Sequence, residues 1–214
     1  MTADNSALES HEARSVGHKQ FLLNLDETPV HESRNGGRNH MQDELKIREK
    51  LPIYAPRKEE GSGPHVLRVD GLVSKGLELR LADLERLPQQ DLTDDFTCLE
   101  GWTVPNVKWR GVLLATVLSL TGPRVEVRFV QASAGDFSVS LSLGHVERAL
   151  LAIRLGESAV PSEHGGPVRL VVPGGECFMN IKWLDHLELR TEPGAHTAKT
   201  IALGRLSPLE PRKY

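Results

Sequence analysis

Between residues 66 and 190 the chain consists of short segments in which apolar and polar residues alternate, separated by Gly and Pro. A period of two places successive side chains on opposite faces of a β-strand, so this pattern predicts a series of short strands. We expect strands at 66–71, 77–81, 125–130, 137–143, 152–155 and 168–172, with residues 181–190 closing the series.

Three short helices are expected between these strands, at 84–87, 112–120 and 145–151. Pro88 ends the first and Gly122-Pro123 ends the second, because proline cannot continue a helix. The sequence shows no internal repeat and neither the Rossmann nor the P-loop glycine pattern. Many short strands with few short helices predict an α+β fold, a β-rich mixed domain.

The two ends of the chain differ from its middle. Residues 1–50 are rich in His, Asn, Glu and Arg and contain one short apolar patch, Phe21-Leu22-Leu23. Such a segment has too little apolar surface to offset the entropy of ordering it by itself. We therefore predict an N-terminal arm or tail at 1–50, with helical character at 41–50, a folded domain at 51–195 and a C-terminal tail at 196–214.

Composition argues against several classes of partner. A net charge of −3 gives no reason to expect nucleic acid or an anionic membrane. No apolar run approaches the ~20 residues of a membrane-spanning helix. The two cysteines lie far apart and the first ten residues carry no export signal, so we expect a cytoplasmic protein with reduced thiols.

The stretch Phe96-Thr97-Cys98-Leu99-Glu100-Gly101-Trp102 places a thiol at the end of an expected strand, with a carboxylate two residues later. A free cysteine is most often a small buried hydrophobe. The alternative is a presented thiolate, which is a strong ligand for soft metals or a nucleophile. Glu100 would then be placed to exchange protons with a group that the metal carries.

Two glycine turns further along the chain precede residues that suit an anion. In the stretch 163–169, His164 and Arg169 can both donate hydrogen bonds to phosphate, beside two glycines that let backbone N–H groups approach a ligand. A second turn is followed by Asn180 and Lys182. The structural alternative is a turn before a buried strand, and a hairpin loop with a solvated lysine.

Two other kinds of site fit the sequence less well. The histidines at 145, 164, 186 and 196, together with the cysteines, are of types that bind zinc, but they lack the C-x₂-C and H-x₃₋₅-H spacings. A hydrolase that uses Cys98 as nucleophile and His164 as base lacks its spacing signature as well.

In their order, these motifs resemble the molybdopterin-binding domain of the sulfite oxidase family over about residues 66–190. The resemblance is carried by the strand-end Cys98, by Trp109-Arg110-Gly111-Val112, by the run from His164 to Gly174 and by Lys182-Trp183-Leu184. The piece from Cys98 to Trp102 is more similar to the bacterial methionine sulfoxide reductase branch than to sulfite oxidases. The resemblance implies the β-rich, mixed α+β fold of that family.

The same resemblance implies molybdenum and molybdopterin as cofactors. Cys98 would be the thiolate ligand of the metal, beside the dithiolene of one pterin, and Cys98 and Glu100 would be the catalytic residues. The residues that would hold the cofactor are Arg38, Asn39, His40, Thr97, Cys98, His164, Arg169, Asn180 and Lys182. The first three have the composition of a cofactor contact made by an N-terminal arm in the family.

The resemblance also implies an activity, with one departure from the family. It implies an oxidoreductase that transfers an oxygen atom to or from a small-molecule substrate and exchanges electrons with a separate partner. The alternative is a non-catalytic molybdopterin-binding or carrier module of the same fold. Phe137 stands where sulfite oxidases carry a tyrosine, which argues against sulfite as the substrate. Cys177 is expected to be a small buried hydrophobe more often than a ligand, although it could approach the pterin.

Overall fold

The computed structural model describes residues 47, 49–53 and 65–206, all within one of the two units of the chain, residues 37–214. The elements in chain order are β1 (Val66–Gly71), β2 (Leu77–Arg80), α2 (Leu81–Glu85), β3 (Gln90–Thr97), β4 (Thr103–Leu113), α3 (Leu114–Ser119), β5 (Phe129–Ala134), β6 (Phe137–Ser142), α4 (Leu143–Val146), β7 (Leu150–Leu155), β8 (Ser158–Ala159), η1 (Ser162–His164), β9 (Arg169–Val171), η2 (Cys177–Met179), β10 (His186–Arg190) and α5 (Thr197–Leu206).

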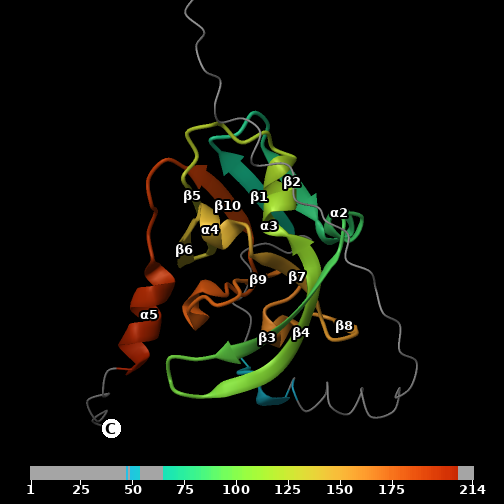
Figure 1. Ribbon diagram of the computed structural model, residues 1–214, viewed down its shortest axis with the longest axis vertical. Coiled ribbons are helices and arrows are strands. Elements are labelled where there is room, and N and C mark those ends of the chain that lie inside the picture. Colours follow the sequence, from blue (N-terminus) through green and yellow to red (C-terminus); the bar gives the residue numbers. More distant parts are fainter. Residues whose placement is uncertain (1–46, 48, 54–64, 207–214) are drawn as a thin grey trace, which may run out of the picture. The chain divides into compact units, whose positions relative to one another are not determined.

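The strands form two sheets, shown in Figure 1. The first has the order β2-β1-β10-β5-β6, in which β1 and β10 are parallel and all other neighbours are antiparallel. The second has the order β3-β4-β7-β8, with β9 paired to β7. Many short strands with a few short helices confirm the predicted α+β, β-rich fold.

Strand β7 contributes to both hydrophobic clusters of the molecule. Its residues Leu151 and Ile153 join the larger cluster, to which alternate residues of β1, β5, β6 and β10 also belong. Leu150 and Ala152 face the opposite way, into a smaller cluster around Trp109 that also contains Leu51. A strand segment that is buried on both faces must be apolar throughout, and this explains the apolar run from Leu150 to Ile153 at the start of β7.

Two of the predicted helices were placed wrongly. The apolar run at 112–120 was predicted as one helix, yet Val112 and Leu113 belong to β4 and pair with Leu151 and Leu150. The predicted helix at 145–151 is also shifted, because α4 ends at Val146 and β7 begins at Leu150. Short apolar runs fit either a helix or a buried strand, and here pairing with the neighbouring strand decides.

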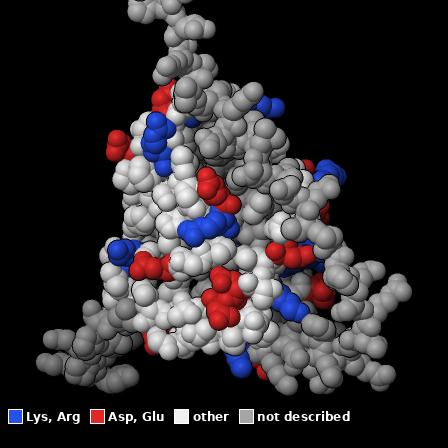
Figure 2. Space-filling view, viewed as in Figure 1, with Lys and Arg blue, Asp and Glu red and all other residues white. Residues whose placement is uncertain are grey.

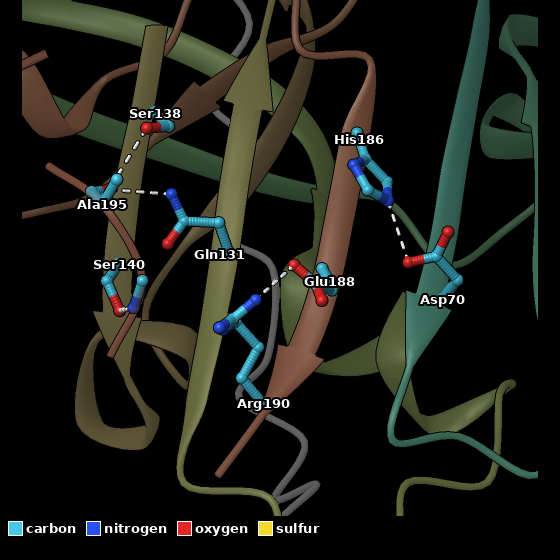
Figure 3. Close-up of polar contacts among 9 residues, drawn as sticks. Asp70, Gln131, Ser138, Ser140, His186, Glu188, Arg190 and Ala195 are labelled. Atoms are coloured by element: carbon cyan, nitrogen blue, oxygen red, sulfur yellow. Dashed lines mark hydrogen bonds and ion pairs between the residues drawn. The ribbon is translucent and has the colours of Figure 1, made fainter. Parts of the chain in front are cut away.

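The face of the first sheet that Figure 3 shows carries polar side chains. His186 on β10 contacts Asp70 on β1, with Nε2 and Oδ1 2.9 Å apart, and Arg190 contacts Glu188 on the same strand. Gln131 on β5 donates from Nε2 to the carbonyl of Ala195 at 2.8 Å. These contacts explain the alternation of β10, whose leucines enter the core while its polar residues face outward.

The segment that follows β10 is fixed to the edge of this sheet. Ser138 on β6 donates from its backbone N–H to Thr197 Oγ1 at 2.9 Å, and Ser140 Oγ accepts from the backbone N–H of Gly194 at 3.1 Å. Helix α5 begins at Thr197 and packs against β6 and η2. The sequence prediction of a C-terminal tail from residue 196 did not anticipate this helix.

Acidic and basic side chains are interspersed among neutral ones on the face shown in Figure 2, so this face carries no large patch of one charge. In the described part of the chain, no helix has both the length and the apolar character needed to cross a membrane.

Of the predicted helical segment 41–50, the described residues Ile47, Glu49 and Lys50 are helical. Arg38, Asn39 and His40 lie outside the described residues.

The close approach of β4 and β7 gives the first testable prediction. A Cβ at Gly111 would lie 2.0 Å from the carbonyl oxygen of Leu151, so only glycine fits between these strands. We expect Gly111→Ala to lower the free energy of unfolding by about 1–3 kcal/mol, the usual cost of overpacking, measured by urea denaturation. The control is Gly144→Ala in α4, where a Cβ meets nothing within 4 Å. Equal stability of the two variants would show that β4 and β7 can separate without loss.

Candidate functional site

A cavity of about 270 Å³ is lined by five of the seven candidate residues that fall in the described part of the chain. Cys98, Glu100, Arg169, Asn180 and Lys182 all line it. They come from the loop after β3, from β9 and from the segment after η2, which are far apart in the sequence. The fold therefore brings together residues that the sequence analysis placed in separate motifs.

A tight turn between β3 and β4 positions Cys98. The backbone N–H of Cys98 donates to the carbonyl of Trp102 at 2.9 Å, and that of Gly101 donates to the carbonyl of Cys98 at 3.0 Å. Gly101 has a φ of +89°, a region that residues with a Cβ rarely adopt. Trp102 Nε1 donates to Glu100 Oε2 at 3.0 Å, which holds this exposed carboxylate at the edge of the cavity.

The second cysteine belongs to the same site. Cys177 is the first residue of η2, and its Sγ lies 3.7 Å from Cys98 Sγ, within the range of an S–H to S hydrogen bond. The backbone N–H of Leu99 donates to Cys177 Sγ at 3.5 Å. Burial raises the pKa of the Cys98 thiol. A hydrogen bond from the backbone of Glu100 opposes this shift, whereas the neighbouring Cys177 and the charge of Glu100 add to it. Both cysteines are half-buried, so Cys177 is more exposed than the small buried hydrophobe that the sequence favoured, and it lines the cavity beside Cys98.

Arg169 is a buried cation held between aromatic rings. Its guanidinium carbon lies 5.2 Å from the ring centroid of Phe96 and 4.9 Å from that of Trp109. Its NH1 donates to the carbonyl of His164 at 2.9 Å, while its Nε has no hydrogen-bond partner among the described residues. Burial lowers the pKa of Arg169 to about 10, so the group remains charged at neutral pH.

Lys182 brings a second positive charge to the cavity. Its Nζ donates to the carbonyls of Pro52 and Glu163, each at 3.0 Å. Burial, and then the charge of Arg169, lower the pKa of Lys182 to about 7, against an opposing effect of Glu163. The side chain lies across Gly165, where a Cβ would come within 2.6 Å of the Lys182 Cγ.

The other predicted residues occupy different positions. Asn180 lines the cavity, and its Oδ1 accepts from the backbone N–H of Val172 at 2.8 Å, which closes the loop between them. His164 is buried and does not line the cavity, although its carbonyl contacts Arg169. Thr97 also lies outside the cavity, with its Oγ1 3.1 Å from that of Thr103.

Sequence reasoning missed two parts of the wall. Aromatic rings line the cavity next to the predicted residues, and each of them is adjacent or close in sequence to one of those residues: Phe96, Trp102, Phe178 and Trp183. Their proximity to Cys98 and Lys182 was a signal that could have found them. Helix α5 contributes Ala198, Ile201 and Ala202, for which the sequence gave no such signal.

A larger hollow of about 580 Å³ lies elsewhere, between α2 and the strands β3, β4 and β7. Its lining includes charged side chains such as Asp91, Lys108 and Arg154, and it contains neither Cys nor His. Within the described residues, no three His, Cys, Asp or Glu side chains gather as a set that could hold a metal ion. The smaller cavity is therefore the better candidate, because it combines a thiol, two cations and aromatic walls.

This combination would suit a flat, anionic ligand that carries a soft metal ion, which a thiolate can ligate. A comparison with known families gives the same answer: the model of the oxidoreductase molybdopterin binding domain matches residues 54–198. The chain belongs to this family, whose domains bind molybdopterin with molybdenum. The cofactors that the sequence predicted are thereby confirmed at the level of the family.

Individual proteins show the same relationship. The chain is 29% identical to the protein-methionine-sulfoxide reductase subunit YedZ1 of Azospira oryzae, over 56% of this chain and 47% of that protein. It is 28% identical to the uncharacterized oxidoreductase YuiH of Bacillus subtilis, over 59% of this chain and 65% of that protein. Among solved structures, the sulfane dehydrogenase SoxCD of Paracoccus pantotrophus matches with a TM-score of 0.58 and 25% identity, over 69% of this chain and 46% of that one. The aligned part thus spans less than two thirds of each of these proteins.

The residues of the cavity fit the family's cofactor. A metal that an organic ligand already holds needs few protein donors, and the Cys98 thiol is a suitable soft one. The buried Nε of Arg169 and the charge of Lys182 suit a phosphate dianion. The aromatic rings at the wall suit a pterin ring.

The lowered pKa of Lys182 gives a second testable prediction. The folded chain releases this proton near pH 7, whereas the unfolded chain keeps it up to the ordinary value of 10.5. Between these values the unfolded state binds more protons, so Lys182 makes the free energy of unfolding rise with pH. We expect the stability of the wild type relative to Lys182→Met to increase from pH 6 to pH 9, measured by urea denaturation.

The matched control for this prediction is Lys75→Met, which removes an exposed lysine. Its stability relative to the wild type should not change between the two pH values. If the free energy of unfolding changed with pH in the same way in the wild type and in Lys182→Met, the lowered pKa of Lys182 would be contradicted.

Proposed function

We propose that this chain is a molybdopterin-dependent oxidoreductase in which Cys98 ligates molybdenum and which transfers an oxygen atom to or from a small molecule. The observation that carries the proposal is the position of the Cys98 thiol in one cavity with the cations Arg169 and Lys182. When bound, the molybdenum cofactor supplies two-electron chemistry coupled to transfer of an oxygen atom. The relatives described above are named as oxidoreductases or as subunits of them, which supports an enzymatic role.

The protein's part is to hold the cofactor in one orientation. Arg169 cannot turn away, because Phe96 and Trp109 enclose its guanidinium group. Lys182 is fixed by two backbone carbonyls and lies on the same cavity wall. An anion at this wall would face two directed positive charges where little water competes, so its phosphate would be bound strongly. Cys98 would then set the place of the metal.

Glu100 and Phe137 would act on the substrate. Glu100 is exposed at the edge of the cavity and is held there by Trp102, so it can pass protons between the site and solvent. Phe137 lines the same cavity and has no hydroxyl group to bind an anionic substrate. With Phe178 and Ile201 also at the wall, the cavity favours an uncharged small molecule such as an organic sulfoxide over sulfite.

Transfer of an oxygen atom would change the oxidation state of the proposed cofactor by two electrons in each turnover. A separate partner protein would supply or remove these electrons. The name of YedZ1 as a subunit supports an arrangement of this kind. The cytoplasmic location stays a prediction.

The direct test of the proposed function is the metal content of Cys98→Ser. Serine replaces a soft ligand by a weak, hard one, so we expect molybdenum per chain to fall roughly tenfold or more. The measurement is elemental mass spectrometry together with the fluorescence of the oxidised pterin, on chains expressed with the cofactor. Cys177→Ser, which removes the neighbouring thiol, should retain molybdenum.

Unchanged molybdenum in Cys98→Ser would contradict the proposed ligand. If the wild type contains pterin but no molybdenum that can be reduced in a redox titration, the chain is a carrier module and the enzymatic proposal fails.

The choice of substrate is tested at Phe137. We expect the wild type to reduce a small sulfoxide, with a low-potential dye as electron donor, and to oxidise sulfite poorly. Phe137→Tyr should raise kcat/KM for sulfite by on the order of tenfold or more, because the hydroxyl can donate to the anion. The control is Phe178→Tyr, at another ring of the same wall, which should leave sulfite turnover low. Efficient sulfite oxidation by the wild type at micromolar substrate would overturn this preference.

A further inference from the structure

The two cysteines of the chain meet in the cavity, although 79 residues separate them in the sequence. Their sulfurs are 3.7 Å apart, and neither side chain is fully buried. The proposed function uses Cys98 alone and assigns no role to Cys177. The pair is therefore a feature of the site that the ligation of one metal by one thiolate does not explain.

The geometry permits a covalent bond between them. A disulfide has its sulfurs about 2.05 Å apart, so the two atoms would have to approach by roughly 1.6 Å. Cys98 stands in the turn after β3, and Cys177 begins the three-residue turn η2, just after Gly174 and Gly175. Neither residue belongs to a strand of the two sheets, so side-chain rotation with a small backbone shift brings the sulfurs together and breaks no pairing between strands.

We propose that Cys98 and Cys177 are an oxidisable pair, which a small-molecule disulfide converts into an intramolecular disulfide when no cofactor occupies the cavity. In the first step, the thiolate of one cysteine attacks a sulfur of the reagent, which forms a mixed disulfide and releases one thiol. In the second, the other cysteine attacks the protein sulfur of that mixed disulfide and releases the second thiol. The protein loses two protons and two electrons, and the reagent disulfide takes them up as two thiols.

This modification has a consequence that rests on the proposed function. A sulfur in a disulfide has no thiolate charge with which to bind a metal, so the oxidised chain would not accept the cofactor at Cys98. Conversely, a thiolate that ligates a metal is not free to attack a disulfide. Cofactor loading and oxidation of the pair would therefore exclude each other, and loading would require reduced cysteines.

The test uses the full chain with and without cofactor, treated with oxidised glutathione at pH 8. After digestion without reductant, mass spectrometry should find the peptides of Cys98 and Cys177 joined, with the chain lighter by two hydrogens, in the cofactor-free protein. Cys98→Ser and Cys177→Ser should each accumulate one glutathione adduct instead, because the second thiol is missing. The cofactor-loaded chain should retain both thiols in a titration with a thiol reagent.

The outcomes separate the two proposals. If the cofactor-free wild type carries two glutathione adducts, or links only between chains, the oxidisable pair is overturned. If the internal disulfide forms as readily in the loaded chain as in the cofactor-free chain, the pair stands and the ligation of the metal by Cys98 is contradicted.

Discussion

The site depends on two positive charges that the fold holds at one mostly apolar cavity. Arg169 is buried between the rings of Phe96 and Trp109, and burial together with the charge of Arg169 lowers the pKa of Lys182 to about 7. Burying like charges together is unfavourable unless an anion offsets them. In the proposed function the phosphate of molybdopterin would be that anion, and its contacts with the two side chains would orient the cofactor. Residue 165 must be glycine for a steric reason, because the Lys182 side chain passes directly over it.

The sequence predicted the fold class and much of the site, because both rest on local patterns. Alternating residues revealed strands such as β1 and β6, whose one face is buried and the other polar. The pattern failed at residues 112–120 and 145–151, where an apolar run is divided between a strand and a helix by its pairing with a neighbour. Boundaries of this kind are set by tertiary contacts between strands, and the periodicity of the sequence does not reveal those contacts.

At the site, chemistry was easier to predict than position. Cys98, Glu100, Arg169, Asn180 and Lys182 line one cavity, as their residue types suggested. His164 and Thr97 have equally suitable side chains, yet neither lines that cavity. The contact between Cys98 and Cys177 joins segments 79 positions apart, and the spacing of residues in the sequence could not predict it. Helix α5 forms a wall of the cavity and lies largely beyond the matched family region, which ends at residue 198.

X-ray absorption at the molybdenum edge would show whether Cys98 is the protein ligand of molybdenum. One pterin dithiolene supplies two sulfurs, so we expect three sulfur neighbours of the metal in the loaded wild type. We also expect all three to remain in Cys177→Ser, which would assign the third sulfur to Cys98. Two sulfur neighbours in the wild type, or the loss of one in Cys177→Ser, would rule out Cys98 as the ligand.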